Sequence, residues 1–278
     1  PYGQQGSKNV KHFEEIIRTK LVRIYDDGSI WVNPDFFTYT TSLRMVRDST
    51  WNKLFEVPRR EPEAEIEQSH CDMAMAIQNV IEEIVLKMAR HAKEITGQEN
   101  ICLSGGVAMN CVATGKLLSS NLFRNIYIAP APGDAGGAIG AALAVWHIYY
   151  ANEKVITTGH DQMSGSYLGP EFRSEEIDEM ISKSNAKATK FTDESELVRN
   201  VATRLVSGEV IGWFQGRMEF GPRALGNRSI LGDPRSSNMQ ERINSTIKKR
   251  ESFRPFAPAV IEESAGKYFE VLWKIAKR

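Results

Sequence analysis

The chain has 278 residues, with 35 basic and 35 acidic side chains, so it carries no formal net charge at pH 7. This length suits one large domain or two modest ones. Hydrophobic residues make up 41% of the chain and charged residues 25%, which excludes a wholly disordered chain, a collagen-like repeat and a disulfide-rich mini-protein. The neutral balance argues against a general binder of nucleic acids or membrane surfaces, although it can conceal local asymmetry.

The cysteine content favours a cytoplasmic protein. Cys71, Cys102 and Cys111 are odd in number and lack the spacing of a metal or redox motif, which favours reduced thiols over a disulfide or zinc framework. No run of 18 apolar residues is present, so we expect no membrane span. The first residues, Pro-Tyr-Gly, are neither an initiator Met nor a signal peptide, and we expect a piece of a longer protein.

In chain order, the first predicted elements are a hairpin and a long helix. Two β-rich runs flank an Asp-Asp-Gly turn within residues 21–32, which is a hairpin signal. Apolar residues then recur at steps of three and four over residues 72–96, which predicts a helix. Ser69 or Asp72 is the predicted cap at its start, and Gly97 is the predicted cap at its end.

Strands, glycine loops and helices alternate in the middle of the chain. Strands are predicted at residues 100–103 and 125–129. Each leads into a glycine-rich loop and then a helix, the first ending near residue 118 and the second covering 138–149. We expect the second, Ala-rich helix to be closely packed. This order predicts an α/β fold with layered helices and strands.

A domain boundary is predicted near residue 160, within a stretch of polar and turn residues. It would divide the chain into domains 1–160 and 161–278. Beyond the boundary the pattern predicts two further helices and two further strands. The helices cover residues 174–185 and 194–207, and the strands cover 210–214 and, as part of the core, 256–260.

The first candidate site is the loop that contains Gly105 and Gly106. Two glycines between a strand and a helix let backbone N–H groups approach a ligand, and a helix N-terminus favours a phosphate or a polar sugar edge. The loop matches neither the dinucleotide fingerprint nor the Walker A pattern. A tight strand–helix turn without any ligand is an equally good interpretation of this pattern.

The second candidate site is the loop at residues 133–137, Gly-Asp-Ala-Gly-Gly. The carboxylate of Asp134 follows a predicted strand, where it could bind a hard cation or orient a ligand hydroxyl. An Asp that merely caps the next helix is the structural alternative. Gly105 and Asp134 are 29 residues apart, and two such loops at neighbouring strand ends favour a nucleotide cleft.

The third candidate site is a basic segment, residues 217–254. It has nine cationic side chains against four carboxylates, a local excess of five positive charges. Several of its arginines adjoin Gly or Pro, which favours held guanidinium groups that bind phosphate or carboxylate, whereas a solvated basic face is the alternative. RNA also fits the charge, because bases could stack on Phe214, Phe220, Phe253 and Phe256. Because residues 256–260 are predicted to be a core strand, we consider nucleic acid a less favoured ligand than a small anion.

Four sequence blocks occur in a characteristic order along essentially the whole chain. They are SGGVAMNC at residues 104–111, PGDAGGA at 132–138, GRMEFGPRALGNRSIL at 216–231 and RESFRPFAP at 250–258. Together they resemble the carbamoyltransferase family, the O-carbamoyltransferases of nodulation-factor and antibiotic biosynthesis. The block at 216–231 is highly specific, whereas the first glycine loop alone is a weak signal.

The resemblance implies a fold and a reaction. Family members resemble a fusion of an actin/Hsp70-like ATPase-type module with an α+β module similar to threonylcarbamoyl-AMP synthase. We therefore expect the second half of the first module in residues 1–160 and part of the second in 161–278. The implied transferase reaction makes carbamoyl-adenylate from carbamoyl phosphate and ATP, and then passes the carbamoyl group to a hydroxyl of a small-molecule acceptor. A divalent metal, iron or magnesium, is expected in the full-length protein.

The resemblance also implies roles for individual residues. The nucleotide would be bound by Gly105, Gly106, Asn110, Gly133 and Gly136. The metal ligand would be Asp134. The catalytic clamp on carbamoyl phosphate would consist of Arg217, Arg223, Arg228, Arg254 and Lys248. Such chemistry needs positioning and charge neutralisation more than it needs a protein nucleophile.

Two other functions remain open from the sequence. One is a threonylcarbamoyl-transfer-like protein that modifies tRNA, because that family shares the modules; the other is a non-catalytic nucleotide- or RNA-binding module. The block at 216–231 favours small-molecule carbamoylation. Because family members are longer, we expect this chain to lack the N-terminal part and the extreme C-terminus and to be inactive or weakly active alone. A homodimer is a possible assembly.

Overall fold

The chain forms two compact units, which are described separately. The computed structural model describes residues 2–62, 64–155 and 163–269. The N-terminal unit is Pro1–Ile128 and the C-terminal unit is Ala129–Arg278. The domain boundary predicted near residue 160 lies outside the described residues, so it stays a prediction.

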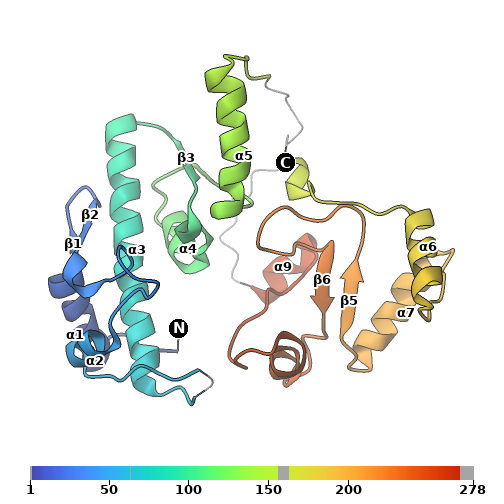
Figure 1. Ribbon diagram of the computed structural model, residues 1–278, viewed down its shortest axis with the longest axis horizontal. Helices are drawn as coiled ribbons and strands as arrows, with labels where there is room; N and C mark the ends of the chain where they lie inside the picture. Colours follow the sequence, from blue (N-terminus) through green and yellow to red (C-terminus); the bar gives the residue numbers. More distant parts are fainter. Residues whose placement is uncertain (1, 63, 156–162, 270–278) are drawn as a thin grey trace. The chain divides into compact units, whose positions relative to one another are not determined.

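The N-terminal unit combines helices with two small sheets (Figure 1). Its helical segments are α1 (Lys8–Ile16), η1 (Ile17–Leu21), η2 (Pro34–Phe36), α2 (Asp48–Phe55), α3 (Gln68–Thr96), η3 (Gly106–Met109) and α4 (Cys111–Ser119). Its strands are β1 (Val22–Ile24), β2 (Ile30–Val32), β3 (Asn100–Leu103) and β4 (Asn125–Ile128). Strands β1 and β2 pair antiparallel, which confirms the predicted hairpin.

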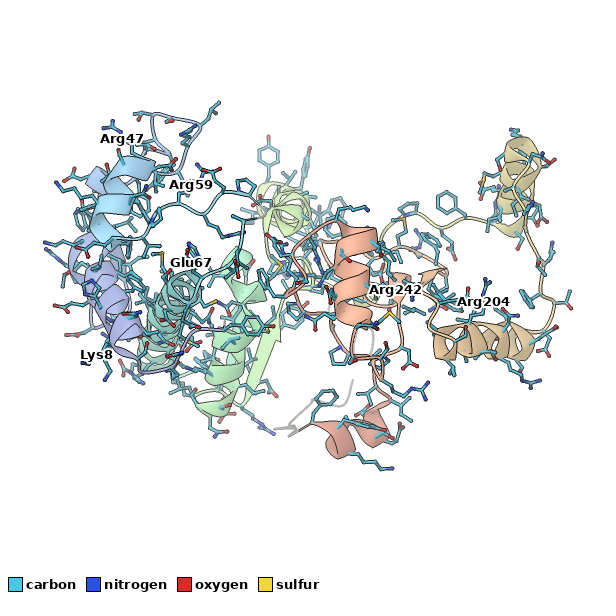
Figure 2. The ribbon with its side chains drawn as sticks, turned by 90° about the horizontal axis from the view of Figure 1, so that it is seen from below. Lys8, Arg47, Arg59, Glu67, Arg204 and Arg242 are labelled. Carbon is cyan, nitrogen blue, oxygen red and sulfur yellow. The ribbon has the colours of Figure 1, made fainter. Side chains whose placement is uncertain are left out.

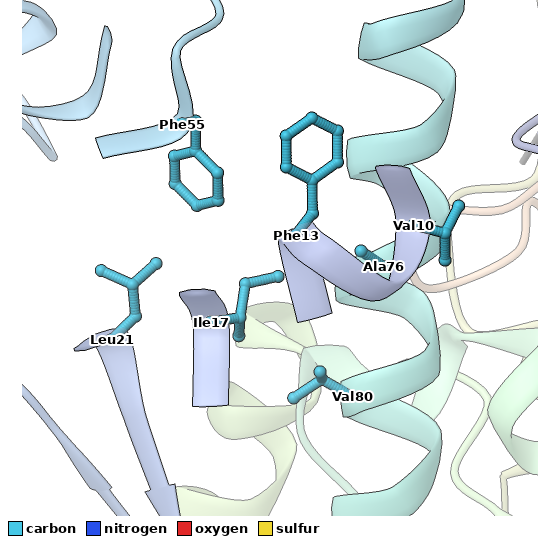
Figure 3. Packing of buried hydrophobic residues seen from close by; sticks show 7 residues of the cluster. All are labelled: Val10, Phe13, Ile17, Leu21, Phe55, Ala76 and Val80. Atoms are coloured by element: carbon cyan, nitrogen blue, oxygen red, sulfur yellow. The ribbon is translucent and has the colours of Figure 1, made fainter. Parts of the chain in front are cut away.

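The main apolar core of this unit lies between α1, α2 and α3, as Figure 3 shows. Its fully buried members are Val10, Phe13, Ile17, Leu21, Phe55, Ala76 and Val80. The first four recur at steps of three or four residues, so they share one face of the continuous α1–η1 helix. The rings of Phe13 and Phe55 lie 5.9 Å apart in an edge-on arrangement. A second small cluster joins α3 to α4 through Ala89, Leu117 and Phe123.

Helix α3 confirms the predicted long helix but begins four residues earlier. Its N-cap is Glu67, whose side chain bonds the first turn while the backbone N–H of Glu67 donates to His70 Nδ1 at 3.1 Å. The predicted caps Ser69 and Asp72 are therefore wrong, because both lie inside the helix. Gly97 ends the helix with φ +64°, as predicted.

A strand–helix–strand unit follows α3. Strands β3 and β4 are parallel and in register from Asn100↔Asn125 to Leu103↔Ile128, with α4 between them in the chain. Their carboxyl ends therefore lie at the same edge of the pair. This confirms both predicted strands and the α/β character of the region. No helix in the described part of the chain is both long enough and apolar enough to cross a membrane.

The C-terminal unit contains short helices and one antiparallel strand pair. Its helical segments are α5 (Asp134–Ala144), η4 (Val145–Tyr149), η5 (Ser164–Ser166), α6 (Ser174–Ser184), α7 (Glu194–Val206), α8 (Met239–Arg242), η6 (Ile243–Lys248) and α9 (Glu262–Tyr268). Strands β5 (Ile211–Phe214) and β6 (Arg228–Leu231) pair with Ile211 opposite Leu231. The predicted helices at 174–185 and 194–207 and the strand at 210–214 are confirmed.

Two packing expectations for the C-terminal unit are wrong. Helix α5 and the adjoining η4 bury none of their side chains, although a closely packed helix was expected over 138–149. Alanine-rich sequence favours a helix through its backbone propensity, but burial requires a partner surface. Residues 256–260 form no strand, and all but Phe256 are exposed. That segment therefore gives no reason to rank nucleic acid lower.

Candidate functional site

The first glycine loop follows β3 and is open to solvent. Gly105 has φ +91°, a conformation that a residue with a Cβ atom rarely adopts. A Cβ atom on Gly105 or Gly106 would meet no other atom within 4 Å. The loop therefore leaves space for a ligand next to its backbone, as the nucleotide prediction requires. A bare strand–helix turn would have the same backbone.

Asn110 connects this loop to the long helix α3. Its side-chain oxygen accepts the N–H of Ala113 at 3.2 Å, which caps α4. The Asn110 amide also exchanges two hydrogen bonds, of 2.9 and 3.2 Å, with Gln78. Gln78 in turn donates to the buried Glu82, which pairs with Lys116 of α4. Asn110 thus has a structural role, and its contact with the nucleotide stays a prediction.

The arginine loop, residues 217–228, is organised by one buried carboxylate. Glu219 Oε1 accepts the backbone N–H groups of Leu225 at 2.6 Å and Asn227 at 2.8 Å. Its Oε2 lies 3.4 Å from Arg228 Nε, and the Glu219 side chain has no exposed surface. Glu219 therefore closes the loop on itself and determines where Arg228 lies.

The Glu219 carboxyl is held in its charged form. Burial raises its pKa, but the N–H donors of Asn227 and Leu225 and the positive charge of Arg228 lower the pKa by more. The net result is a pKa below the ordinary value of 4.5. At neutral pH the loop therefore contains a buried negative charge that stabilises the Arg228 guanidinium.

Backbone pairing fixes the other end of the arginine loop. Met218 donates its N–H to the carbonyl of Pro170 and accepts the N–H of Gly169, both at 2.9 Å. Arg217 binds the same segment. Its guanidinium donates to the Gly169 carbonyl at 3.0 Å and lies 3.6 Å from the carboxylate of Glu171. Arg217 and Arg228 are thus held at opposite ends of one loop.

Arg254 belongs to a second group, which Asn244 organises. Asn244 is fully buried, and its amide donates to the carbonyls of Ser252 at 3.0 Å and Arg254 at 2.7 Å. Its oxygen accepts a hydrogen bond of 2.7 Å from Arg250 Nε. The Arg254 guanidinium lies 2.9 Å from Glu251. A buried amide therefore shapes this segment as Glu219 shapes the arginine loop.

Arg223 and Lys248 are the unpaired cations of the predicted clamp. Both are exposed, and neither has a hydrogen bond or ion pair with any described residue. No such bond joins the arginine loop to Arg254 or Lys248 among the residues that the structure describes. The structure thus brings Arg217, Arg223 and Arg228 together in one loop, and the convergence of all five residues on one ligand stays a prediction.

The remaining basic residues are partly neutralised by local partners. Arg235 donates to the Asp233 carboxylate at 2.6 to 3.1 Å. These bonds and the Arg235 backbone N–H lower the pKa of Asp233 to about 2. Arg242, labelled in Figure 2, donates to the carbonyl of Gly208 at 2.7 Å. Local partners therefore neutralise part of the charge of this segment, and its binding of an anion stays a prediction.

The second glycine loop contacts the arginine loop within the C-terminal unit. Both meet at Ala131, which is 2% exposed. A Cβ atom on Gly136 would lie 2.0 Å from the Ala131 carbonyl oxygen, and one on Gly221 would lie 3.0 Å from the Ala131 Cβ atom. Gly133 is the N-cap of α5. Close packing therefore explains Gly136 without a nucleotide, whose binding by Gly133 and Gly136 stays a prediction.

Asp134 occupies the first position of α5. Its side chain is exposed and makes no capping hydrogen bond, so the capping alternative is wrong, although a negative charge there suits the helix dipole. No three His, Cys, Asp or Glu side chains in the described part of the chain lie close enough to hold a metal ion. The described residues therefore do not fit a complete metal site, and the role of Asp134 as a metal ligand stays a prediction.

Comparison with known proteins decides the family. The family model described as Carbamoyltransferase N-terminus matches residues 2–143, which is more than half of the chain. The model described as Carbamoyltransferase C-terminus matches residues 202–276. The chain belongs to the carbamoyltransferase family. The resemblance based on the four sequence blocks is thereby confirmed.

Several curated relatives of this chain are longer than the chain itself. An uncharacterized protein of Synechocystis sp. is 48% identical over 98% of the chain and 43% of its own length. Nodulation protein NolO of Bradyrhizobium diazoefficiens is 43% identical over 73% of the chain and 36% of its own length. The 3'-hydroxymethylcephem-O-carbamoyltransferase of Streptomyces clavuligerus is 29% identical over 74% and 36%. The chain thus spans less than half the length of these relatives.

Sequence reasoning missed the two residues that shape the candidate site, Glu219 and Asn244. Glu219 was counted only as one acid among many cations. A single carboxylate inside a glycine-rich arginine block is a usable signal, because such a charge must be paired if it is buried. Asn244 offers no comparable signal, since an uncharged polar residue between Ile243 and Ser245 is unremarkable in the sequence.

Proposed function

We propose that this carbamoyltransferase moves a carbamoyl group from carbamoyl phosphate to a hydroxyl of a small-molecule acceptor. The arginine loop carries the proposal: two of its arginines are held by partners, and the third is free to bind an anion. A guanidinium binds a phosphate through paired N–H donors. Family membership supports carbamoyl transfer as the reaction.

The loop would act by neutralising charge at fixed positions. When a nucleophile attacks the carbonyl carbon of an acyl phosphate, negative charge builds on the carbonyl oxygen. Preorganised cations lower the barrier of such a step. Arg217 and Arg228 need no reorganisation, because Glu171 and Glu219 already hold them. Arg223 would bind the phosphate of the donor directly. We assign Arg254 and Lys248 a supporting part in the same clamp.

We also propose that the reaction depends on ATP and passes through carbamoyl-adenylate. Water would convert carbamoyl phosphate to carbamate and inorganic phosphate, and carbamate would take the adenylyl group of ATP with release of pyrophosphate. The acceptor hydroxyl would then displace AMP from carbamoyl-adenylate. Open space beside Gly105 and Gly106 supports nucleotide binding in the N-terminal unit, with Asn110 positioning the loop. Gly133 and Gly136 are the corresponding candidates in the C-terminal unit. No step is derived through a metal, since the described residues provide no ligand set.

The finer fold assignment is part of this proposal. The parallel β3–α4–β4 unit of the N-terminal unit is compatible with the second half of an actin/Hsp70-like ATPase-type module. The antiparallel β5–β6 pair of the C-terminal unit is compatible with part of a threonylcarbamoyl-AMP-synthase-like module. Three free cysteines support the cytoplasm as the compartment. A homodimer remains our candidate assembly.

Calorimetric titration with carbamoyl phosphate tests the proposal. Arg223→Gln removes a free cation and no internal contact, so we expect an intact fold and binding weaker by about tenfold or more, as for one lost charge-assisted bond. Arg204→Gln is the matched control, because Arg204 is an exposed arginine of the same unit that pairs with Glu209 (Figure 2). Equal weakening in both variants, or none in Arg223→Gln, would contradict the clamp.

A second titration separates the competing functions. If the chain acts on tRNA, filter binding of tRNA should be tight and should fall steeply as salt is raised. We expect no such binding. A steady-state assay completes the test, because we expect this chain alone to transfer carbamoyl groups weakly or not at all.

A further inference from the structure

A cavity of about 420 Å³ lies in the N-terminal unit and has no part in the proposed carbamoyl transfer. It is bounded by α2, by the segments on either side of α2, and by the first turn of α3. Its walls include Arg44, Trp51, Phe55, Arg59, Arg60 and His70. Cavities of this size, with apolar walls and a few convergent polar groups, are typical of small-molecule sites.

His70 contributes a hydrogen-bond donor that has no partner. Its Nδ1 accepts the backbone N–H of Glu67 at 3.1 Å, so the neutral ring carries its proton on Nε2. Nε2 is buried and has no hydrogen-bond partner in the described structure. A buried N–H group without a partner is costly, and a ligand oxygen in the cavity would satisfy it.

The polar wall of the cavity is positively charged. Arg44 and Arg59 both pair with the single carboxylate of Asp48, at 3.7 and 3.0 Å. Arg60 donates to the carbonyl of Ala64 at 2.6 Å. The Arg44 and Arg59 guanidinium groups thus share one carboxylate. Figure 2 shows Arg59 on the segment between α2 and Glu67, the N-cap of α3. An anion would complete the charge balance.

Another part of the cavity lining is aromatic, with Trp51 and Phe55 in contact. The indole N–H of Trp51 donates to the Phe36 carbonyl at 2.8 Å, which uses its polar group outside the cavity. The Trp51 ring lies 5.4 Å from the Phe55 ring and 5.7 Å from the Phe37 ring. Met73 of α3 adds a further apolar surface. Such aromatic surface favours a flat apolar group as a ligand.

We propose that this cavity binds a small organic anion, a carboxylate attached to a flat apolar ring. One carboxylate oxygen accepts the His70 Nε2–H, and the other faces Arg59 and Arg44. The ring lies against Trp51 and Phe55. The ligand chemistry follows from the juxtaposition of one orphaned donor, an excess of guanidinium groups and an aromatic wall.

Three probes test the proposed chemistry by calorimetry and by NMR of the full chain. Benzoate carries both features, benzyl alcohol has the ring without the charge, and inorganic phosphate has charge without the ring. We expect saturable benzoate binding that shifts the His70 ring and Trp51 indole signals. We expect the other two probes to bind weaker by about tenfold or more. Phosphate binding as tight as benzoate binding, or no saturable benzoate binding, would overturn the proposal.

Two variants test the assigned residues. His70→Glu keeps an acceptor for the Glu67 N–H, as in a standard capping box, but its carboxylate has no N–H donor. Arg59→Gln leaves α3 unchanged. We expect each to weaken benzoate binding by about tenfold, the loss typical of one charge-assisted contact. Arg124→Gln, an exposed arginine of the same unit paired with Glu99, should have less than about a twofold effect. Equal effects in all three variants would overturn the assignment.

Discussion

The N-terminal and C-terminal units differ in the interactions that stabilise each of them. In the N-terminal unit, α1, α2 and α3 bury a continuous apolar cluster around Phe13 and Phe55. In the C-terminal unit, α5, α6 and α7 bury no side chain, whereas the polar residues Glu219 and Asn244 are buried. The comparison teaches that the candidate site loops are shaped by hydrogen bonds to buried polar groups, while the N-terminal scaffold depends on apolar packing.

Removing the aromatic ring of Phe13 from the apolar core should have the largest effect on stability. Phe13→Ala deletes a side chain that is 4% exposed, so we expect the free energy of unfolding of the N-terminal unit to fall by about 3–5 kcal/mol. Urea denaturation measures it. Phe172→Ala is the control, because this C-terminal phenylalanine is 54% exposed and should change stability by less than about 0.5 kcal/mol. Similar losses in both would remove the contrast.

Removing the buried carboxylate of Glu219 should destabilise the arginine loop of the C-terminal unit. Glu219→Ala leaves the N–H groups of Leu225 and Asn227 without their acceptor, and we expect a loss of about 3 kcal/mol. Hydrogen exchange at these two amides should accelerate. Glu171→Ala serves as the control, since that exposed carboxylate only pairs with Arg217 and should cost less than about 1 kcal/mol. Unchanged exchange in Glu219→Ala would show that other contacts hold the loop.

Lowering the pH should reduce the free energy of unfolding of both units, through different carboxylates. The pKa of Glu219 is lowered in the folded state, so the stability it contributes is present above the ordinary pKa and is lost as pH falls through the folded pKa. In the N-terminal unit the same sign holds for Asp72: burial raises its pKa, but hydrogen bonds from Gln4, Gln68 and Asn9 lower it by more. Urea unfolding between about pH 3 and pH 6 should show stability rising with pH in both units. Glu219→Gln should flatten the rise only in the C-terminal unit.

The smallest expected effect concerns an exposed pair. Asp233 should titrate at about 2 in an NMR experiment, because Arg235 bonds its carboxylate. In Arg235→Gln we expect the pKa to rise towards 3.8, with the fold unchanged. A normal titration of Asp233 in the unmodified chain would mean that the pair does not persist in solution.

Local signals in the sequence predicted most of the elements. The periodic apolar residues of α3, the Asp-Gly turn between β1 and β2, and the two strands before the glycine loops are all present as expected. Each of these signals acts within one turn of helix or one hairpin. The expectations that failed concerned burial, at 138–149 and at 256–260, because burial depends on segments elsewhere in the chain.

The candidate site was predicted only in part for the same reason. The arginines of residues 217–228 were singled out from their glycine and proline neighbours, and their family block was recognised. The roles of Glu219 and Asn244 were not, because a buried polar residue looks like an exposed one in the sequence. Nothing in the sequence near His70 indicated that its Nε2 atom would be buried without a hydrogen-bond partner in the described structure.

The sequence by itself determined the family of this protein, many of its helices and strands, and the arginines of the predicted anion site. Only the tertiary structure decided which charges are paired, which glycines are required by close packing, and where a cavity remains. Helical periodicity and turn chemistry are properties of neighbouring residues. The bonds from Gln4 to Asp72 and from Met218 to Pro170, and the contact between Gly221 and Ala131, join residues that become neighbours only when the chain folds.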